Sequence, residues 1–168
     1  DAAFTIGRLP DHYFQGIGGG PGPIGIHEKA DRLIEAGLFE GPAPRQHVSQ
    51  NVEHHPIHNA WQAGRDHLIP EDYPAEEVEV YSDYLLNKGP AYGQVGAVHD
   101  ILKASNGQTY VVERAAAERA RGRALSSHSS GRCSKISRGS ASAAMTIISA
   151  MPRLSVFVAS FAPFLSCF

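Results

Sequence analysis

Histidines are concentrated in one short part of this chain. The protein has nine histidines, and the following five lie between residues 47 and 67: His47, His54, His55, His58 and His67. Neutral imidazole is a common metal ligand and the usual general base near neutral pH. The clustering therefore predicts a shared chemical site, centred on the run Glu53-His54-His55-Pro56-Ile57-His58.

The proline in this run predicts the local backbone. Pro56 suits the first turn of a helix, where its missing N–H costs nothing, and a helix is expected from Pro56 to Ala63. The residue before a proline avoids the helical region. His54 and His55 are therefore expected on extended backbone just before the helix, with His58 in its first turn.

A pair of histidines that leads from a strand end into a helix is the setting expected for a metal-dependent nuclease. Neighbouring side chains on extended backbone point in opposite directions, so one imidazole would ligate a divalent cation while the other deprotonates water. The metal would stabilise the charge that develops during attack on a phosphodiester. Phosphodiester hydrolysis is the leading functional hypothesis, with His54 and His55 as catalytic residues.

These motifs carry a family resemblance. The segment from Leu33 to Pro56 resembles the start of HNH/endonuclease VII-type toxin domains of bacterial polymorphic toxins, with Val52-Glu53-His54-His55-Pro56-Ile57 as the comparable motif. Val98-His99-Asp100-Ile101-Leu102 is similar to the trailing helix of those domains. The resemblance covers residues 27–120 and implies a secreted toxin nuclease that acts on nucleic acid.

The resemblance also implies roles for single residues. One of His54 and His55 would be the general base, and the other would support a divalent metal, magnesium or zinc. The metal ligands implied in this way are His55, His58, His99 and Asp100, with His67 as a further candidate.

Two other functions stay open at this stage. A different metal-dependent hydrolase or an oxygenase would use His54, His58 and a carboxylate, either Glu53 or Asp66, as a facial ligand set. A non-enzymatic binding module would instead meet a basic protein partner through the acidic stretch 71–83.

The charge distribution bears on these partners. Residues 1–112 contain 7 Lys or Arg and 15 Asp or Glu, a balance of 7 − 15 = −8. Residues 113–168 contain 8 Lys or Arg and 2 Asp or Glu, a balance of 8 − 2 = +6. An acidic body argues against non-specific nucleic-acid binding and suits a cation or a basic partner.

The elements that must position these residues follow from hydrophobic periodicity. Apolar residues at helical spacing predict helices over 27–36 and 93–104, and the Ala-, Glu- and Arg-rich stretch 113–124 should also be helical. Alternation at 78–81 predicts a short strand, and 108–112 is a strand or the lead into the next helix. The expected fold class is α+β: a small, loop-rich domain of three or four helices with a short β-hairpin or sheet.

A glycine- and proline-rich run precedes these elements. Gly16-Ile17-Gly18-Gly19-Gly20-Pro21-Gly22-Pro23 has the composition of a phosphate-cradling loop, but no Lys-Ser/Thr follows it and no strand clearly precedes it. The favoured interpretation is a flexible, irregular arm over residues 1–26.

The remaining boundaries follow from composition. A globular domain with the histidine cluster is expected over 27–125, a Ser/Gly/Arg-rich linker over 126–142 and a hydrophobic, poorly ordered tail over 143–168. The charge-free stretch Leu154–Phe168 is shorter than the roughly 20 residues of a membrane span, so membrane association of the tail is disfavoured. The only cysteines, Cys133 and Cys167, lie in the last third of the chain and leave the compartment undetermined.

Overall fold

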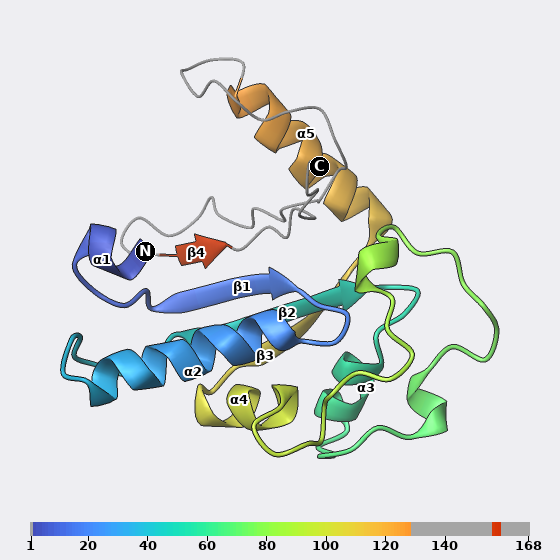
Figure 1. The fold of residues 1–168 in the computed structure, drawn as a ribbon. Helices are drawn as coiled ribbons and strands as arrows, with labels where there is room; N and C mark the ends of the chain where they lie inside the picture. Colours follow the sequence, from blue (N-terminus) through green and yellow to red (C-terminus); the bar gives the residue numbers. More distant parts are fainter. Residues whose placement is uncertain (1, 129–155, 159–168) are drawn as a thin grey trace, which may run out of the picture.

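The structure is a computed structural model, and it describes residues 2–128 and 156–158 (Figure 1). Its helices and strands, in chain order, are α1 (Ala2–Ile6), β1 (His12–Gly16), α2 (Pro21–Glu35), β2 (Arg45–Asn51), α3 (Pro56–Gln62), the 3-10 helices η1 (Pro70–Asp72) and η2 (Asp83–Leu85), α4 (Val98–Ala104), β3 (Gln108–Val112), α5 (Arg114–His128) and β4 (Val156–Val158).

The strands form one parallel sheet in the order β3-β2-β1-β4. Phe14 of β1 lies opposite His47 of β2, and Ser49 of β2 lies opposite Tyr110 of β3. The predicted α+β class is confirmed, and the sheet is parallel because a helix-containing connection separates β1 from β2 and β2 from β3.

Helices α2, α3 and α4 cover the same face of the sheet. Gln15 and Val48 are register partners and so point to one side. Gln15 lies against Gly22 of α2, and Val48 belongs to a buried cluster with residues of α3 and α4. The members of that cluster are Ile17, Val48, Ile57, Ala60, Tyr92, Val98 and Leu102. This core fixes the carboxyl ends of β1 and β2 relative to α3 and α4.

The glycine run is part of the fold, so the predicted irregular arm is wrong. Its first residue ends β1, and α2 begins at Pro21, well before the predicted residue 27. Gly20 has φ +87 and serves as the N-cap, and Pro21 occupies the first turn, where its fixed φ favours a helix. The strand was missed because β1 is short and polar, and tertiary pairing with β2 and β4 sets its conformation.

Other boundaries were predicted with mixed success. The helix that begins at Pro56 and the strand over 108–112 are confirmed. The strand predicted at 78–81 is wrong, because that stretch pairs with no strand in the described part of the chain, although Val80 is buried. Helix α4 starts only at Val98, because Gly96 takes φ +73 just before it.

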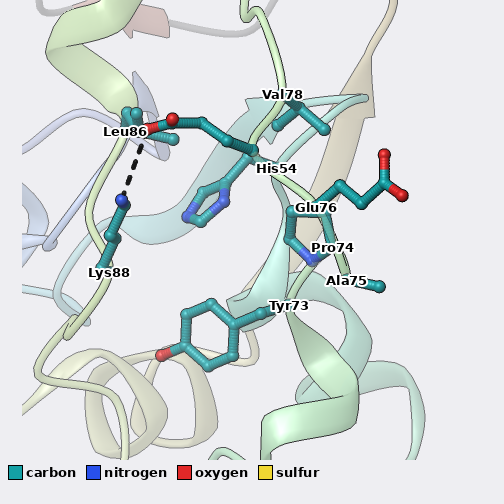
Figure 2. Close-up of a pocket in the computed structure, with 9 residues that line it drawn as sticks. His54, Tyr73, Pro74, Ala75, Glu76, Val78, Leu86 and Lys88 are labelled. Carbon is teal, nitrogen blue, oxygen red and sulfur yellow. Dashed lines mark ion pairs between the residues drawn. The ribbon is translucent and has the colours of Figure 1, made fainter.

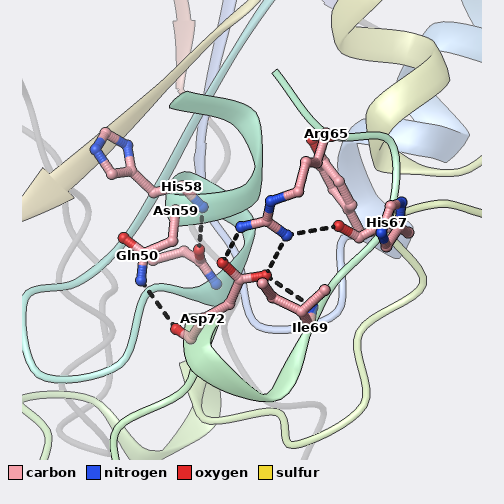
Figure 3. Close-up of polar contacts among 8 residues, drawn as sticks. Gln50, His58, Asn59, Arg65, His67, Ile69 and Asp72 are labelled. Carbon is pink, nitrogen blue, oxygen red and sulfur yellow. Dashed lines mark hydrogen bonds and ion pairs between the residues drawn. The ribbon is translucent and has the colours of Figure 1, made fainter. Parts of the chain in front are cut away.

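A buried ion pair organises the loop after α3 (Figure 3). The Asp72 side chain is 3% exposed and accepts hydrogen bonds from both terminal nitrogens of the Arg65 guanidinium. It also accepts one from the backbone N–H of Ile69, at 2.9 Å. Asp72 was expected on a solvated acidic stretch, and the structure instead places it inside the fold.

The predicted linker and tail, 126–142 and 143–168, lie outside the described residues except for the end of α5 and the three residues of β4. Within the described ranges, no helix has the length and apolar character needed to cross a membrane.

Candidate ligand-binding site

The catalytic histidines predicted from the sequence have separate structural surroundings. His54 is 3% exposed, and its Nε2 donates a hydrogen bond to the backbone oxygen of Asn87 at 3.0 Å. The rings of His55 and His58 lie 5.9 Å apart between centroids. His58 Nδ1 bonds Thr109 Oγ1 at 2.9 Å, and burial lowers the pKa of His58.

The predicted metal ligands are not assembled into one site. His99 and Asp100 contact each other on α4, with His99 Nδ1 3.1 Å from Asp100 Oδ1, and the His99 ring lies against Trp61 and Tyr92. His67 bonds its neighbour Asp66. Over residues 2–128 and 156–158, no three His, Cys, Asp or Glu side chains come close enough to hold a metal ion. The proposed set His55, His58, His99 and Asp100 is therefore not formed.

A line of polar side chains crosses the sheet face opposite the three helices. Tyr110 donates to Gln108, so its oxygen accepts from His47 Nδ1 at 2.9 Å. His47 Nε2 is then free to accept from His12 Nδ1 at 2.8 Å. Phe14 stacks on the His47 ring at 4.3 Å between centroids. This arrangement requires a neutral His47.

Protonation of His47 is therefore unfavourable in the folded protein. Burial first, and then the nearby charges of His12 and Arg45, lower the pKa of His47 from 6.5 to about 4. In the unfolded chain the imidazole titrates near its ordinary value. The unfolded state thus binds more protons between these two pKa values, and stability falls as the pH falls through this window.

We expect the free energy of unfolding to decrease between about pH 6.5 and pH 4 because of this residue. His47→Gln, which cannot titrate, should reduce that decrease when urea unfolding is followed at several pH values. His67→Gln, which changes an exposed histidine, is the matched control. An unchanged pH profile in His47→Gln would contradict the assignment.

A row of unpaired backbone donors lies between β1 and α2. The N–H groups of Gly18, Gly19, Gly20 and Gly22 donate no hydrogen bond within the described part of the chain. Gly22 is in the first turn of α2, where N–H groups have no partner inside the helix. Helix N-termini preceded by glycine-rich loops bind phosphate and other anions for this reason.

Three glycines of this loop lie so close to neighbouring atoms that an added Cβ would force a shift. A Cβ on Gly20 would overlap Cγ2 of Val98, and a Cβ on Gly22 would overlap the Gln15 amide. A Cβ on Gly18 would lie 3.2 Å from the backbone of Leu85. The loop is therefore held closely by the surrounding chain, with its N–H groups fixed in place.

A buried side chain adds a further donor to this region. Gln15 is 8% exposed, and its Oε1 accepts a hydrogen bond from the Tyr13 hydroxyl at 2.7 Å. Its Nε2 forms no hydrogen bond with any described residue and lies beside Gly22. An amide donor thus faces the first turn of α2.

The loop also occupies the edge of the sheet where ligands bind in parallel α/β folds. It follows the carboxyl end of β1, and β2 and β4 lie on opposite sides of β1. The strand order thus changes direction at β1, and such switch points form ligand crevices. The sequence contained the two relevant signals, Pro21 and the glycines, but the short strand before them was not recognised.

The chain is similar to curated proteins named cysteate synthase. It is 46% identical over 116 residues to that of Methanocorpusculum labreanum, which covers 67% of this chain and 28% of the relative. It is 42% identical over 125 residues to that of Methanocella paludicola, with 72% and 29% covered. For Methanosarcina mazei the identity is 38% over 118 residues, with 68% and 28% covered.

These similarities correct the functional prediction. The relatives are named for the synthesis of cysteate, so the HNH nuclease resemblance and the toxin, secreted and hydrolase assignments are wrong. Neither the alternative metal-dependent enzyme nor the binding module gains support from them. No protein-family model matches the chain. The chain is similar to cysteate synthases over about two thirds of its own length and spans little more than a quarter of theirs, 28% for the Methanocorpusculum protein.

Proposed function

We propose that this chain provides the phosphate-binding part of an enzyme related to the cysteate synthases. The observation that carries the proposal is the row of N–H groups at Gly18, Gly19, Gly20 and Gly22, at the N-terminus of α2, that donate to nothing within residues 2–128 and 156–158. Its position at the carboxyl end of β1 is the one where parallel sheets bind ligands. The similarity to cysteate synthases supplies the reaction class.

The chemistry of that reaction class suggests the ligand. Cysteate is an amino acid that carries a sulfonate on its β-carbon, and exchange of a group at that carbon proceeds through a stabilised carbanion. Pyridoxal phosphate supplies the electron sink for such chemistry when bound, and it carries one phosphate monoester. The N–H groups of the glycine loop fit that phosphate, and Gln15 lies beside Gly22 to donate a further hydrogen bond.

The full chain should bind pyridoxal 5′-phosphate, measured by equilibrium dialysis and by the phosphorus NMR signal of the ligand. Gly19→Ala should weaken this binding about tenfold or more. A Cβ at this position would lie 2.6 Å from Asn87 Nδ2, the movable end of a side chain, so the fold can adjust while the methyl group narrows the loop.

Gly122→Ala, in α5, is the matched control, because a Cβ there meets nothing within 4 Å. Pyridoxal, which lacks the phosphate, is the ligand control. Equal binding of pyridoxal and its phosphate, or an unchanged affinity in Gly19→Ala, would overturn the proposal.

The predicted basic protein partner of the 71–83 stretch stays a prediction. The exposed carboxylates of that stretch, such as Glu77 and Glu79, are consistent with it, and a pull-down with a charge-reversed 76–79 variant would test it.

A further inference from the structure

The segment from Leu85, the last residue of η2, to Lys88 is called here the strap, and it separates the glycine loop from a neighbouring cavity. A Cβ on Gly18 would meet the Leu85 backbone, and one on Gly19 would meet the Asn87 side chain. Leu86 and Lys88 line the cavity on the other side. The side chain of Leu85 lies beside Gly16 and that of Asn87 beside Gly19, so both lie on the loop side of the strap.

The cavity beside the strap has a volume of about 300 Å³ and contains His54 in its wall (Figure 2). Its other lining residues are Tyr73, Pro74, Ala75, Glu76, Glu77, Val78, Leu86 and Lys88. Figure 2 shows the His54 ring between the strap and the Tyr73–Ala75 side. His54 therefore contacts the strap from the face opposite the glycine loop.

Asn51 at the end of β2 and His54 just after it bind the strap and the chain immediately before it. His54 Nε2 donates to the backbone oxygen of Asn87 at 3.0 Å, and Asn51 Nδ2 donates to the backbone oxygen of Ser82 at 3.2 Å. The sheet therefore sets where the strap lies over the loop. His54 is buried, so its hydrogen bond to Asn87 is protected from competition with water.

The Asn87 side chain is oriented toward the loop. Its Oδ1 accepts a hydrogen bond from the N–H of Gly89 at 2.8 Å, which fixes the amide so that Nδ2 lies beside Gly19. Nδ2 donates to no residue within the described ranges. A phosphate held by the N–H groups of Gly18 and Gly19 could thus accept one more hydrogen bond, from Asn87 Nδ2.

We propose that Asn87 binds the ligand phosphate through Nδ2 and that His54 is the residue that positions it. This inference rests on the proposed phosphate site. Gln15 supports that site independently of the strap, because it is buried and its amide donor beside Gly22 bonds none of the described residues. Asn87 Nδ2 would add a side-chain donor beside Gly19 to the backbone donors of the loop.

The test measures the affinity of the full chain for pyridoxal 5′-phosphate in Asn87 variants. Asn87→Ala removes the donor and should weaken binding about tenfold. Asn87→Asp keeps the acceptor for Gly89 and adds a negative charge beside the phosphate, so it should weaken binding further. Leu86→Met, on the cavity side of the strap, is the matched control and should bind as the wild type does.

The role of His54 is tested by a conservative exchange and by coupling. His54→Ala should weaken binding, whereas His54→Gln, which retains an N–H donor, should restore part of it. In the Asn87→Ala background, His54→Ala should have little further effect, because both act through the same donor. Thermal unfolding of each variant shows that a folded protein is being compared.

The outcomes separate the two proposals. If Gly19→Ala weakens binding but both Asn87 variants bind as the wild type does, the inference about Asn87 is wrong and the phosphate site stands. Additive effects of His54→Ala and Asn87→Ala would reject the positioning role alone. If the wild-type chain binds no phosphate ester, the phosphate site and the inference fail together.

Discussion

Gly20→Ala should lower the free energy of unfolding by about 2–4 kcal/mol, from backbone strain and overpacking together. Gly20 has φ +87, a conformation that costs an alanine roughly 1–2 kcal/mol. The added Cβ would also overlap Cγ2 of Val98, which is fully buried in the core. Urea unfolding followed by circular dichroism would measure the loss.

Gly25→Ala is the matched control for this variant. Gly25 lies in the same helix, a Cβ there meets nothing within 4 Å, and alanine is the better helix former by about 0.5–1 kcal/mol. The two alanine variants should therefore change stability in opposite directions. If Gly20→Ala is as stable as Gly25→Ala, the close packing of the loop on α4 is not as described.

Asp72→Asn should destabilise the fold by about 2–4 kcal/mol, because it leaves the Arg65 guanidinium without its carboxylate. Asp72 accepts hydrogen bonds from Arg65 and from the N–H of Ile69, and an amide replaces only part of these. Asp11→Asn, which changes an exposed ion pair with Arg8, should have an effect below about 1 kcal/mol. Thermal unfolding of the two variants gives the comparison.

The ionisation of Asp72 determines how the difference in unfolding free energy between the wild type and Asp72→Asn varies with pH. The hydrogen bond from Arg65 lowers the pKa of Asp72 below its ordinary value. A carboxyl whose pKa is lower in the folded state contributes stability that is complete above its unfolded pKa, near 3.9, and that is lost as the pH falls through the folded pKa. The wild type and Asp72→Asn should therefore converge in stability as the pH falls through the lowered pKa of folded Asp72, and a difference that stays constant down to the acid-unfolding limit would contradict this account.

The sequence predicted those elements whose signals are local. Pro56 and the apolar spacing after it predicted α3 correctly, because a proline in the first turn and a buried face act within one helix. The strand His12–Gly16 carried no such signal. Its Tyr13 and Gln15 face the helices and its Phe14 contacts His47, so its pairing with β2 and β4, and no local pattern, makes it a strand.

The candidate site was misplaced for a related reason. Clustered imidazoles suggested a shared metal, but two of them, His54 and His58, take different partners from distant parts of the chain: Asn87 for His54 and Thr109 for His58. These partners are separated from the histidines by 33 and 51 positions. No local sequence pattern predicts contacts over such separations. The glycine run could be recognised in the sequence. Its role as a candidate anion site could not be predicted, because that role depends on the strand β1 before it and on the strap that lies over it.

The two prolines in the first turn of α2 make the glycine loop rigid before any ligand binds. Pro21 and Pro23 contribute no N–H and restrict the backbone on either side of Gly22, so little conformational freedom is left to lose when an anion arrives. The remaining donors are peptide and carboxamide groups, which do not ionise. The glycine loop itself would therefore act as a fixed array of dipoles at every pH, and it would attract the ligand phosphate more strongly once the second phosphate ionisation, near pH 6, is complete.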